Sequence, residues 1–133
     1  MKKEEKLSLI QYRLERAIES IKAAQLLLEN NLLIPAMNRI YYSMFYAVQA
    51  LLVQNEKSFS KHGQVKSYFK REFIKTGILP KEFGRLFNAV FEYRQKFDYV
   101  DLIVPDPEFL SDYIIEAKRF VEKIAVHLNV KIF

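Results

Sequence analysis

Residues 35–53 read PAMNRIYYSMFYAVQALLV, and this stretch decides the fold. Its proline suits the first turn of a helix, and apolar side chains then occur on almost every face of the helix that follows. A helix that is apolar all round needs partners on all sides, so we expect it at the centre of a helical bundle. Asn38, Arg39, Ser43 and Gln49 interrupt the apolar run, which argues against a membrane span.

Amphipathic patterns flank this central segment on both sides. Apolar residues recur at three- and four-residue steps, which predicts helices, and no stretch of useful length alternates with period two as a strand would. We expect Ser60 to be the N-cap of the helix that follows the central one. The fold class is therefore an all-α, antiparallel up-and-down bundle of four to five helices, forming a single domain over residues 1–133. The four flanking helices are expected over residues 7–28, 61–75, 80–97 and 107–128.

The positive charge of the chain gathers in its middle third. Residues 57–96 contain ten Lys or Arg and three Glu, a net charge of +7, whereas residues 1–56 carry +1 and residues 97–133 carry −3. A field of one sign favours polyanions such as RNA, nucleotides or an acidic protein partner. A solvated, lysine-rich face is the alternative interpretation of the same pattern.

Several classes of protein are excluded by composition. The chain has no Cys, which excludes a disulfide scaffold, a thiolate zinc site, an iron–sulfur cluster and a cysteine nucleophile. Its glycines are isolated, so no phosphate-binding glycine loop is expected, and we expect neither a metal nor a cofactor. The charged residues 1–6 open no apolar segment of a signal peptide, and we therefore expect a cytoplasmic protein.

Arg39 stands out because it is the only charged residue between Glu29 and Glu56. Arginine is seldom fully buried unless it is paired. Tyr42 and Tyr46 follow it by three and seven residues, so one flank of the helix offers a guanidinium group beside phenols. Either Arg39 reaches solvent or a carboxylate of a later helix, or it binds an anionic ligand.

A second polar cluster lies near the end of the helix over residues 80–97. Arg94 interrupts an apolar stripe there, and Asp98 follows four residues later, which predicts an intrahelical ion pair. Tyr99 extends the cluster at the helix end, where a site facing a cleft is plausible. His62 begins the preceding basic helix, at a position where an imidazole contacts an anion or carries a proton.

Four segments together resemble the HEPN domains of bacteria and archaea: residues 36–52, 61–65, 73–80 and 93–99. More narrowly, they are similar to small stand-alone HEPN proteins with an Arg…Asp-Tyr signature. The resemblance covers nearly the whole chain in order. It implies an antiparallel helical bundle that is usually a homodimer and is often encoded beside a minimal nucleotidyltransferase, as a toxin–antitoxin pair.

The resemblance also implies a possible activity. Many HEPN domains are metal-independent endoribonucleases in which an arginine is followed four to six residues later by a histidine. Arg94 matches that arginine, but Asp98, Tyr99, Val100 and Asp101 occupy the window of the histidine. Without the imidazole we expect no metal-independent cleavage, unless the fold brings His62 beside Arg94.

We therefore expect a nucleotide- or RNA-binding module that acts with a nucleotidyltransferase partner. One alternative is a ribonuclease in which Arg94 stabilises the phosphate while His62 or Tyr99 handles protons. Another is a purely structural interaction dimer with a salt-bridge network. The expected binding residues are Arg39, Tyr42, Tyr46, His62, Lys66, Lys70 and Arg94, and the catalytic candidates are Arg94, Asp98, Tyr99 and His62.

Overall fold

A computed structural model describes residues 1–132, and Phe133, the last residue of the expected domain, lies outside the described residues. Every regular element among the described residues is helical, which confirms the predicted all-α class. The elements are α1 (Lys3–Glu29), α2 (Leu33–Gln54), α3 (His62–Phe69), η1 (Lys70–Ile74), α4 (Lys81–Tyr99) and α5 (Pro107–His127).

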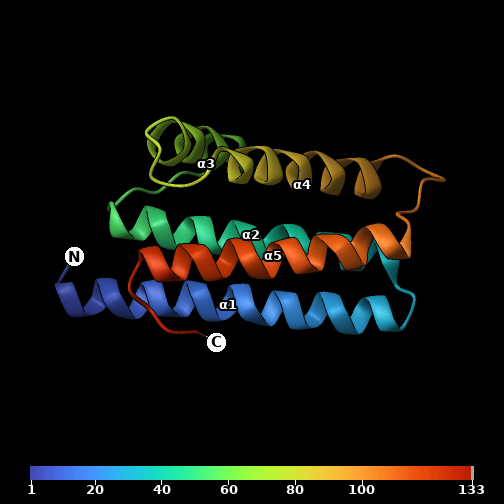
Figure 1. The fold of residues 1–133 in the computed structure, drawn as a ribbon, viewed down its shortest axis with the longest axis horizontal. Helices are drawn as coiled ribbons and strands as arrows, with labels where there is room; N and C mark the ends of the chain where they lie inside the picture. The colour runs from blue at the N-terminus through green and yellow to red at the C-terminus, as the bar shows by residue number, and fades with distance from the viewer. Residues whose placement is uncertain (133) are drawn as a thin grey trace.

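Helix α2 lies in the middle of the bundle, between α1 on one side and α3 and α4 on the other, with α5 alongside it (Figure 1). The ribbon shows that α1 and α4 run in one direction while α2 and α5 run in the other (Figure 1). This is the expected up-and-down arrangement of long helices, to which the short α3 is added.

The central position of α2 follows from its sequence. More than half of its 22 residues are buried, including Tyr41, which has no exposed surface. The buried hydroxyl of Ser43 donates a hydrogen bond to the carbonyl of Ile40 at 2.6 Å, so this polar group is satisfied within the helix. Among residues 1–132, none of the helices combines the length and the apolar character that a bilayer span requires.

Helix α5 begins at residue 107 as expected, whereas α1 begins at Lys3 and not at residue 7, and the predicted N-cap of α3 is wrong. The Asp106 carboxylate accepts a hydrogen bond from the backbone N–H of Glu108 at 2.7 Å and caps α5. Ser60 is not the N-cap of α3, because that helix begins at His62 and Lys61 is its N-cap. The backbone N–H of Lys61 donates to the Gln64 side chain at 3.2 Å, and this contact fixes the start of the helix one residue later.

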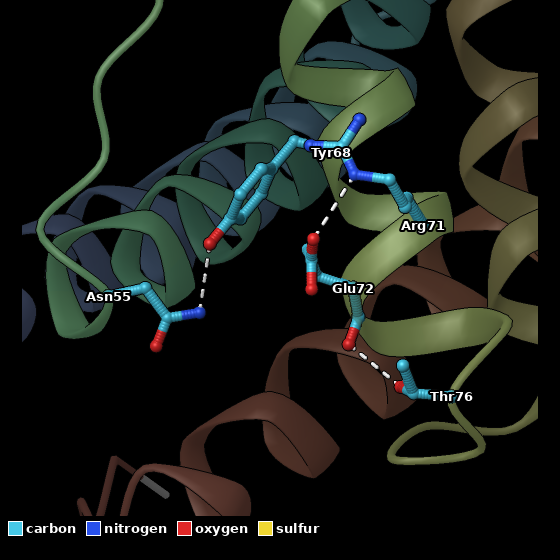
Figure 2. Close-up of polar contacts among 5 residues, drawn as sticks. All are labelled: Asn55, Tyr68, Arg71, Glu72 and Thr76. Carbon is cyan, nitrogen blue, oxygen red and sulfur yellow. Dashed lines mark hydrogen bonds and ion pairs between the residues drawn. The ribbon is translucent and has the colours of Figure 1, made fainter.

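The helix expected over residues 61–75 changes type partway along. After α3 the chain forms a π-helix, η1, in which the N–H of Lys75 donates to the carbonyl of Lys70, five residues back, at 2.9 Å. The wider turn allows the consecutive residues Phe73 and Ile74 both to be buried. Figure 2 shows the polar contacts around it: Thr76 donates to the carbonyl of Glu72 at 2.7 Å.

Candidate functional site

Arg94 of α4 lies against two tyrosines of α2. Its guanidinium carbon is 5.1 Å from the ring centroid of Tyr41 and 5.4 Å from that of Tyr42. A cation over the face of an aromatic ring is attracted by the ring's electron density, more strongly where water is excluded. The Arg94 side chain keeps only 16% of its surface exposed, so the α2–α4 contact holds a nearly buried positive charge.

Arg39 of α2 reaches the same tyrosine. Its guanidinium carbon is 4.8 Å from the Tyr42 centroid, and its Nη2 donates to the Asn38 side-chain oxygen at 2.9 Å. None of the ion pairs found within residues 1–132 involves Arg39. The structure therefore does not pair Arg39 with a carboxylate of a later helix, which was one of the alternatives. Two guanidinium groups therefore lie within 5.4 Å of the centre of one phenol ring.

Asp98 supplies the negative charge of this cluster. Its Oδ2 lies 3.6 Å from Arg94 Nε, which confirms the predicted ion pair across one helical turn, and accepts a hydrogen bond from Asn38 Nδ2 at 3.3 Å. The distance to Arg94 is too long for a hydrogen bond, and Nε is buried without a hydrogen-bond partner among the described residues. One carboxylate thus balances only one of the two guanidinium groups.

His62 joins the cluster from α3. Its Nδ1 lies 2.9 Å from the Tyr41 hydroxyl, and its ring stacks on Phe45 with centroids 4.1 Å apart. Burial lowers the pKa of His62, and the positive charge of Arg94 lowers it further. The imidazole is therefore neutral at pH 7. The fold brings His62 and Arg94 to the same ring, Tyr41, close enough for the Arg94 charge to act on the imidazole, so His62 remains a catalytic candidate.

The buried phenol of Tyr41 links His62 to Arg94. Burial raises the pKa of Tyr41, and the nearby Arg94 charge only partly opposes this effect. The phenol therefore stays protonated and remains a hydrogen-bonding partner of the imidazole. We call the cluster of these contacting residues the Arg94 centre. It consists of Arg39, Tyr41, Tyr42, His62, Arg94 and Asp98.

Tyr46 lies one helical turn from the centre. Its ring centroid is 5.8 Å from that of Tyr42, and its hydroxyl accepts a hydrogen bond from Arg16 Nη2 of α1 at 3.1 Å. The Arg16 guanidinium carbon also lies 5.1 Å from the Tyr46 centroid. The aromatic and cationic surface of the centre thus continues toward α1.

The other expected site residues lie apart from this cluster. Lys66 Nζ donates to the Asn88 side chain at 2.9 Å and lies 4.3 Å from the Phe91 ring centroid, so it bridges α3 to α4. Lys70 is exposed on η1. Tyr99 is 72% exposed at the end of α4, and no contact places it on the Arg94 guanidinium group.

Sequence reasoning missed the role of Tyr41, because it counted this residue only as one of the apolar positions of α2. A signal was present in the spacing. Asn38, Tyr41 and Phe45 lie three and four residues apart, so they share one helix face, and their side chains contact Asp98 and His62. Within residues 1–132, no three His, Asp or Glu side chains gather in a way that could hold a metal ion.

Comparison with known proteins places the chain in a family. The sequence model of the HEPN domain matches residues 10–127. A UPF0332 protein of Thermotoga maritima is 45% identical over 120 residues, which cover 90% of this chain and 91% of the relative.

Two further relatives come from the archaeon Methanocaldococcus jannaschii. The protein named "Putative toxin MJ0605" is 34% identical over 115 residues, or 86% of this chain and 85% of the relative. "Putative toxin MJ0142" is 42% identical over 86 residues, or 65% of this chain and 58% of the relative. The family match extends over nearly the whole helical bundle and includes α2 and the Arg94 centre, and the chain belongs to the HEPN domain family.

Proposed function

We propose that this chain binds RNA and that the Arg94 centre holds a phosphate of the RNA backbone. The observation that carries the proposal is that Arg39 and Arg94 both lie against the Tyr42 ring, with Asp98 as the counter-charge. An anionic ligand supplies the charge and the hydrogen-bond acceptors that two guanidinium groups need.

The chemistry around the two arginines favours RNA over a carboxylate ligand. Tyr42 and Tyr46 are half-buried phenols with centroids 5.8 Å apart, and aromatic side chains and arginine planes are the groups on which unpaired bases stack. The guanidinium fork matches a phosphate in bidentate geometry. Phosphate and base contacts are thus available within one patch. A toxin-type role, as in the names of the archaeal relatives, is consistent with a protein that acts on RNA.

Metal-independent RNA cleavage is a second candidate function, favoured by the position of His62. The imidazole lies at hydrogen-bond distance from Tyr41, and Tyr41 lies under the Arg94 guanidinium group. The 2′-hydroxyl would attack the adjacent phosphorus, forming the P–O2′ bond and breaking the P–O5′ bond. Neutral His62 would accept the hydroxyl proton, water would protonate the departing 5′ oxygen, and Arg94 would stabilise the added charge on the phosphate.

The test of binding uses Arg94→Ala together with a matched arginine control. Arg119 of α5 is a suitable control because it pairs with Glu82 and Glu116, away from the Arg94 centre. In fluorescence anisotropy with single-stranded RNA, we expect Arg94→Ala to lose about 1–3 kcal/mol of binding free energy, the scale of a charge-assisted hydrogen bond, and Arg119→Ala to lose almost none. Equal affinity of the two variants would refute the proposal.

Cleavage is tested separately with the same proteins in the presence of a chelator. If His62 accepts the proton, the wild type produces fragments ending in a 2′,3′-cyclic phosphate, and His62→Phe binds RNA without cutting it. A wild type that binds RNA and leaves it intact would reject the ribonuclease and keep the binding function. The nucleotidyltransferase partner implied by the family resemblance stays a prediction, and co-purification from the native host checks it.

A further inference from the structure

A groove lies between the α3–η1 segment and α4, apart from the residues of the Arg94 centre. Its volume is about 540 Å³, and its floor includes buried aromatic side chains such as Phe69 and Phe87. The residues that line it include five cations and no carboxylate. We call this surface the lysine groove. Its cations are Lys66, Lys70, Lys75, Lys81 and Arg85.

The acidic residues near this groove are engaged elsewhere. Glu72 of η1 pairs with Arg71 at 3.1 Å, and Figure 2 shows the two side chains meeting beside Tyr68. Glu82 of α4 pairs with Arg119 of α5 at 2.9 Å. Glu72 and Glu82 thus form their ion pairs outside the groove, the pKa of Glu82 being lowered mainly by Arg119 and less by Arg85, and among the described residues the lining holds five cations and no carboxylate. A bound polyanion would balance their charge.

Two unusual features of the chain build the groove. The π-helix η1 contributes Lys70 and Ile74 to the lining, and Gly84 of α4 lies opposite Ile74. A Cβ atom added at Gly84 would lie 3.0 Å from Ile74 Cγ2, a contact tighter than most Cβ atoms make. Glycine therefore allows η1 to pack closely against α4, and this contact sets the distance between the two sides of the groove.

The groove comes near the Arg94 centre at Lys66. Lys66 lines the groove and also lies over the Phe91 ring, whose centroid is 6.0 Å from that of Tyr41. Arg85 and Arg94 are nine residues apart on α4, which is about 14 Å along the helix axis at 1.5 Å per residue, and nine residues make two and a half turns, so the two side chains leave opposite sides of the helix. At about 3.4 Å per nucleotide of a stacked strand, a path around the helix from one to the other takes more than about four nucleotides.

We propose that the lysine groove is a second phosphate-binding subsite, which holds the backbone of a single-stranded RNA several nucleotides away from the phosphate at Arg94. This inference rests on the proposed RNA-binding function. The groove has a volume of about 540 Å³ and five cations, which are contacts for the phosphates of one strand. Its cations bind phosphates regardless of sequence, whereas the stacking side chains lie at the Arg94 centre.

The test compares two double variants that remove the same charge. Lys70→Ala/Arg85→Ala removes two groove cations, and Lys118→Ala/Lys123→Ala removes two exposed lysines of α5. Binding of a labelled single-stranded RNA of about twelve nucleotides is measured by anisotropy between about 50 and 200 mM salt. We expect the groove variant to bind at least about tenfold more weakly at the lower salt concentration. We also expect the slope of log K against log salt to become smaller in magnitude by about 1.4, because each of the two lost phosphate contacts contributes about 0.7 to it.

A dinucleotide is the second probe, because it is too short to reach both sites. We expect the groove variant to bind the dinucleotide as the wild type does, while Arg94→Ala weakens both probes. If the long RNA binds the groove variant as it binds the α5 control, the subsite is refuted and the Arg94 proposal stands. If the wild type binds neither RNA, both proposals fail. If the variant loses affinity for duplex RNA and not for the single strand, the assignment of the occupant is wrong.

Discussion

The hydrogen bond between Tyr41 and His62 gives the sharpest test of how the Arg94 centre is built. Tyr41→Phe removes the hydroxyl that lies 2.9 Å from His62 Nδ1 and changes little else, because the ring stays between its aromatic neighbours. Tyr41 is fully buried and His62 is partly buried, so Nδ1 loses its partner in a place with limited access to water. Leaving such a group unsatisfied costs about 1–3 kcal/mol.

The expected size of the loss separates this mechanism from simple packing. We expect Tyr41→Phe to lower the free energy of unfolding by about 1–2 kcal/mol in a urea titration, with an unchanged slope. Tyr41→Ala also removes the ring and should cost more, about 3–5 kcal/mol, because it leaves a cavity in the core. The loss in Tyr41→Phe measures the contribution of the hydroxyl to the free energy of unfolding. The further loss in Tyr41→Ala measures the contribution of the ring.

A double-mutant cycle with His62→Phe assigns the loss to this pair. Phe at position 62 keeps an aromatic ring against Phe45 and removes the imidazole nitrogen. If the hydrogen bond exists, the double variant loses about 1 kcal/mol less than the sum of the single losses, since the second change has no bond left to break. Additive losses, or a Tyr41→Phe variant as stable as the wild type, would refute the account of how His62 is held.

Three further predictions follow from other features of the fold. Because the pKa of His62 is lowered in the folded protein, the unfolded chain binds a proton more readily, and the free energy of unfolding should fall as the pH drops below about 6.5. In urea titrations at several pH values, His62→Phe should reduce this loss. Gly84→Ala should lower the melting temperature because its Cβ would crowd Ile74, whereas Gly63→Ala, in the first turn of α3 with nothing within 4 Å, should leave it unchanged or raise it. The homodimer implied by the family resemblance is checked by light scattering at micromolar concentration, where a mass near 15.8 kDa would contradict it.

The bundle could be predicted from the sequence because its signals are local. The apolar run of α2 and the helical pattern that begins at Pro107 each depend on residues that are neighbours in the chain. The helices that they predict are both present in the structure. The π-helix could not be predicted, because its wide turn accompanies the burial of both Phe73, which contacts His127 of α5, and Ile74, which contacts Gly84 of α4. That burial comes from tertiary packing and leaves no periodic signal in η1.

The candidate site could be predicted only in part. Arg39 and Arg94 attract attention because each interrupts an apolar pattern, and the ion pair from Arg94 to Asp98 follows from their spacing. The contact between Tyr41 and His62 joins α2 to α3 across 21 residues of sequence, so no local pattern encodes it. The sequence could therefore show which polar side chains interrupt an apolar pattern. Which of them contact one another could be seen only in the folded structure.

The most direct test of the central claim is whether Arg39 and Arg94 bind the same RNA phosphate. Affinities for single-stranded RNA are measured for the wild type, Arg39→Ala, Arg94→Ala and the double variant, with circular dichroism to show that each remains helical. We predict that each single variant binds about 5- to 150-fold more weakly, corresponding to 1–3 kcal/mol, and that the double variant loses clearly less than the sum, because both groups act on one phosphate. Wild-type affinity in both single variants, or strictly additive losses, would contradict a shared phosphate site at the Arg94 centre.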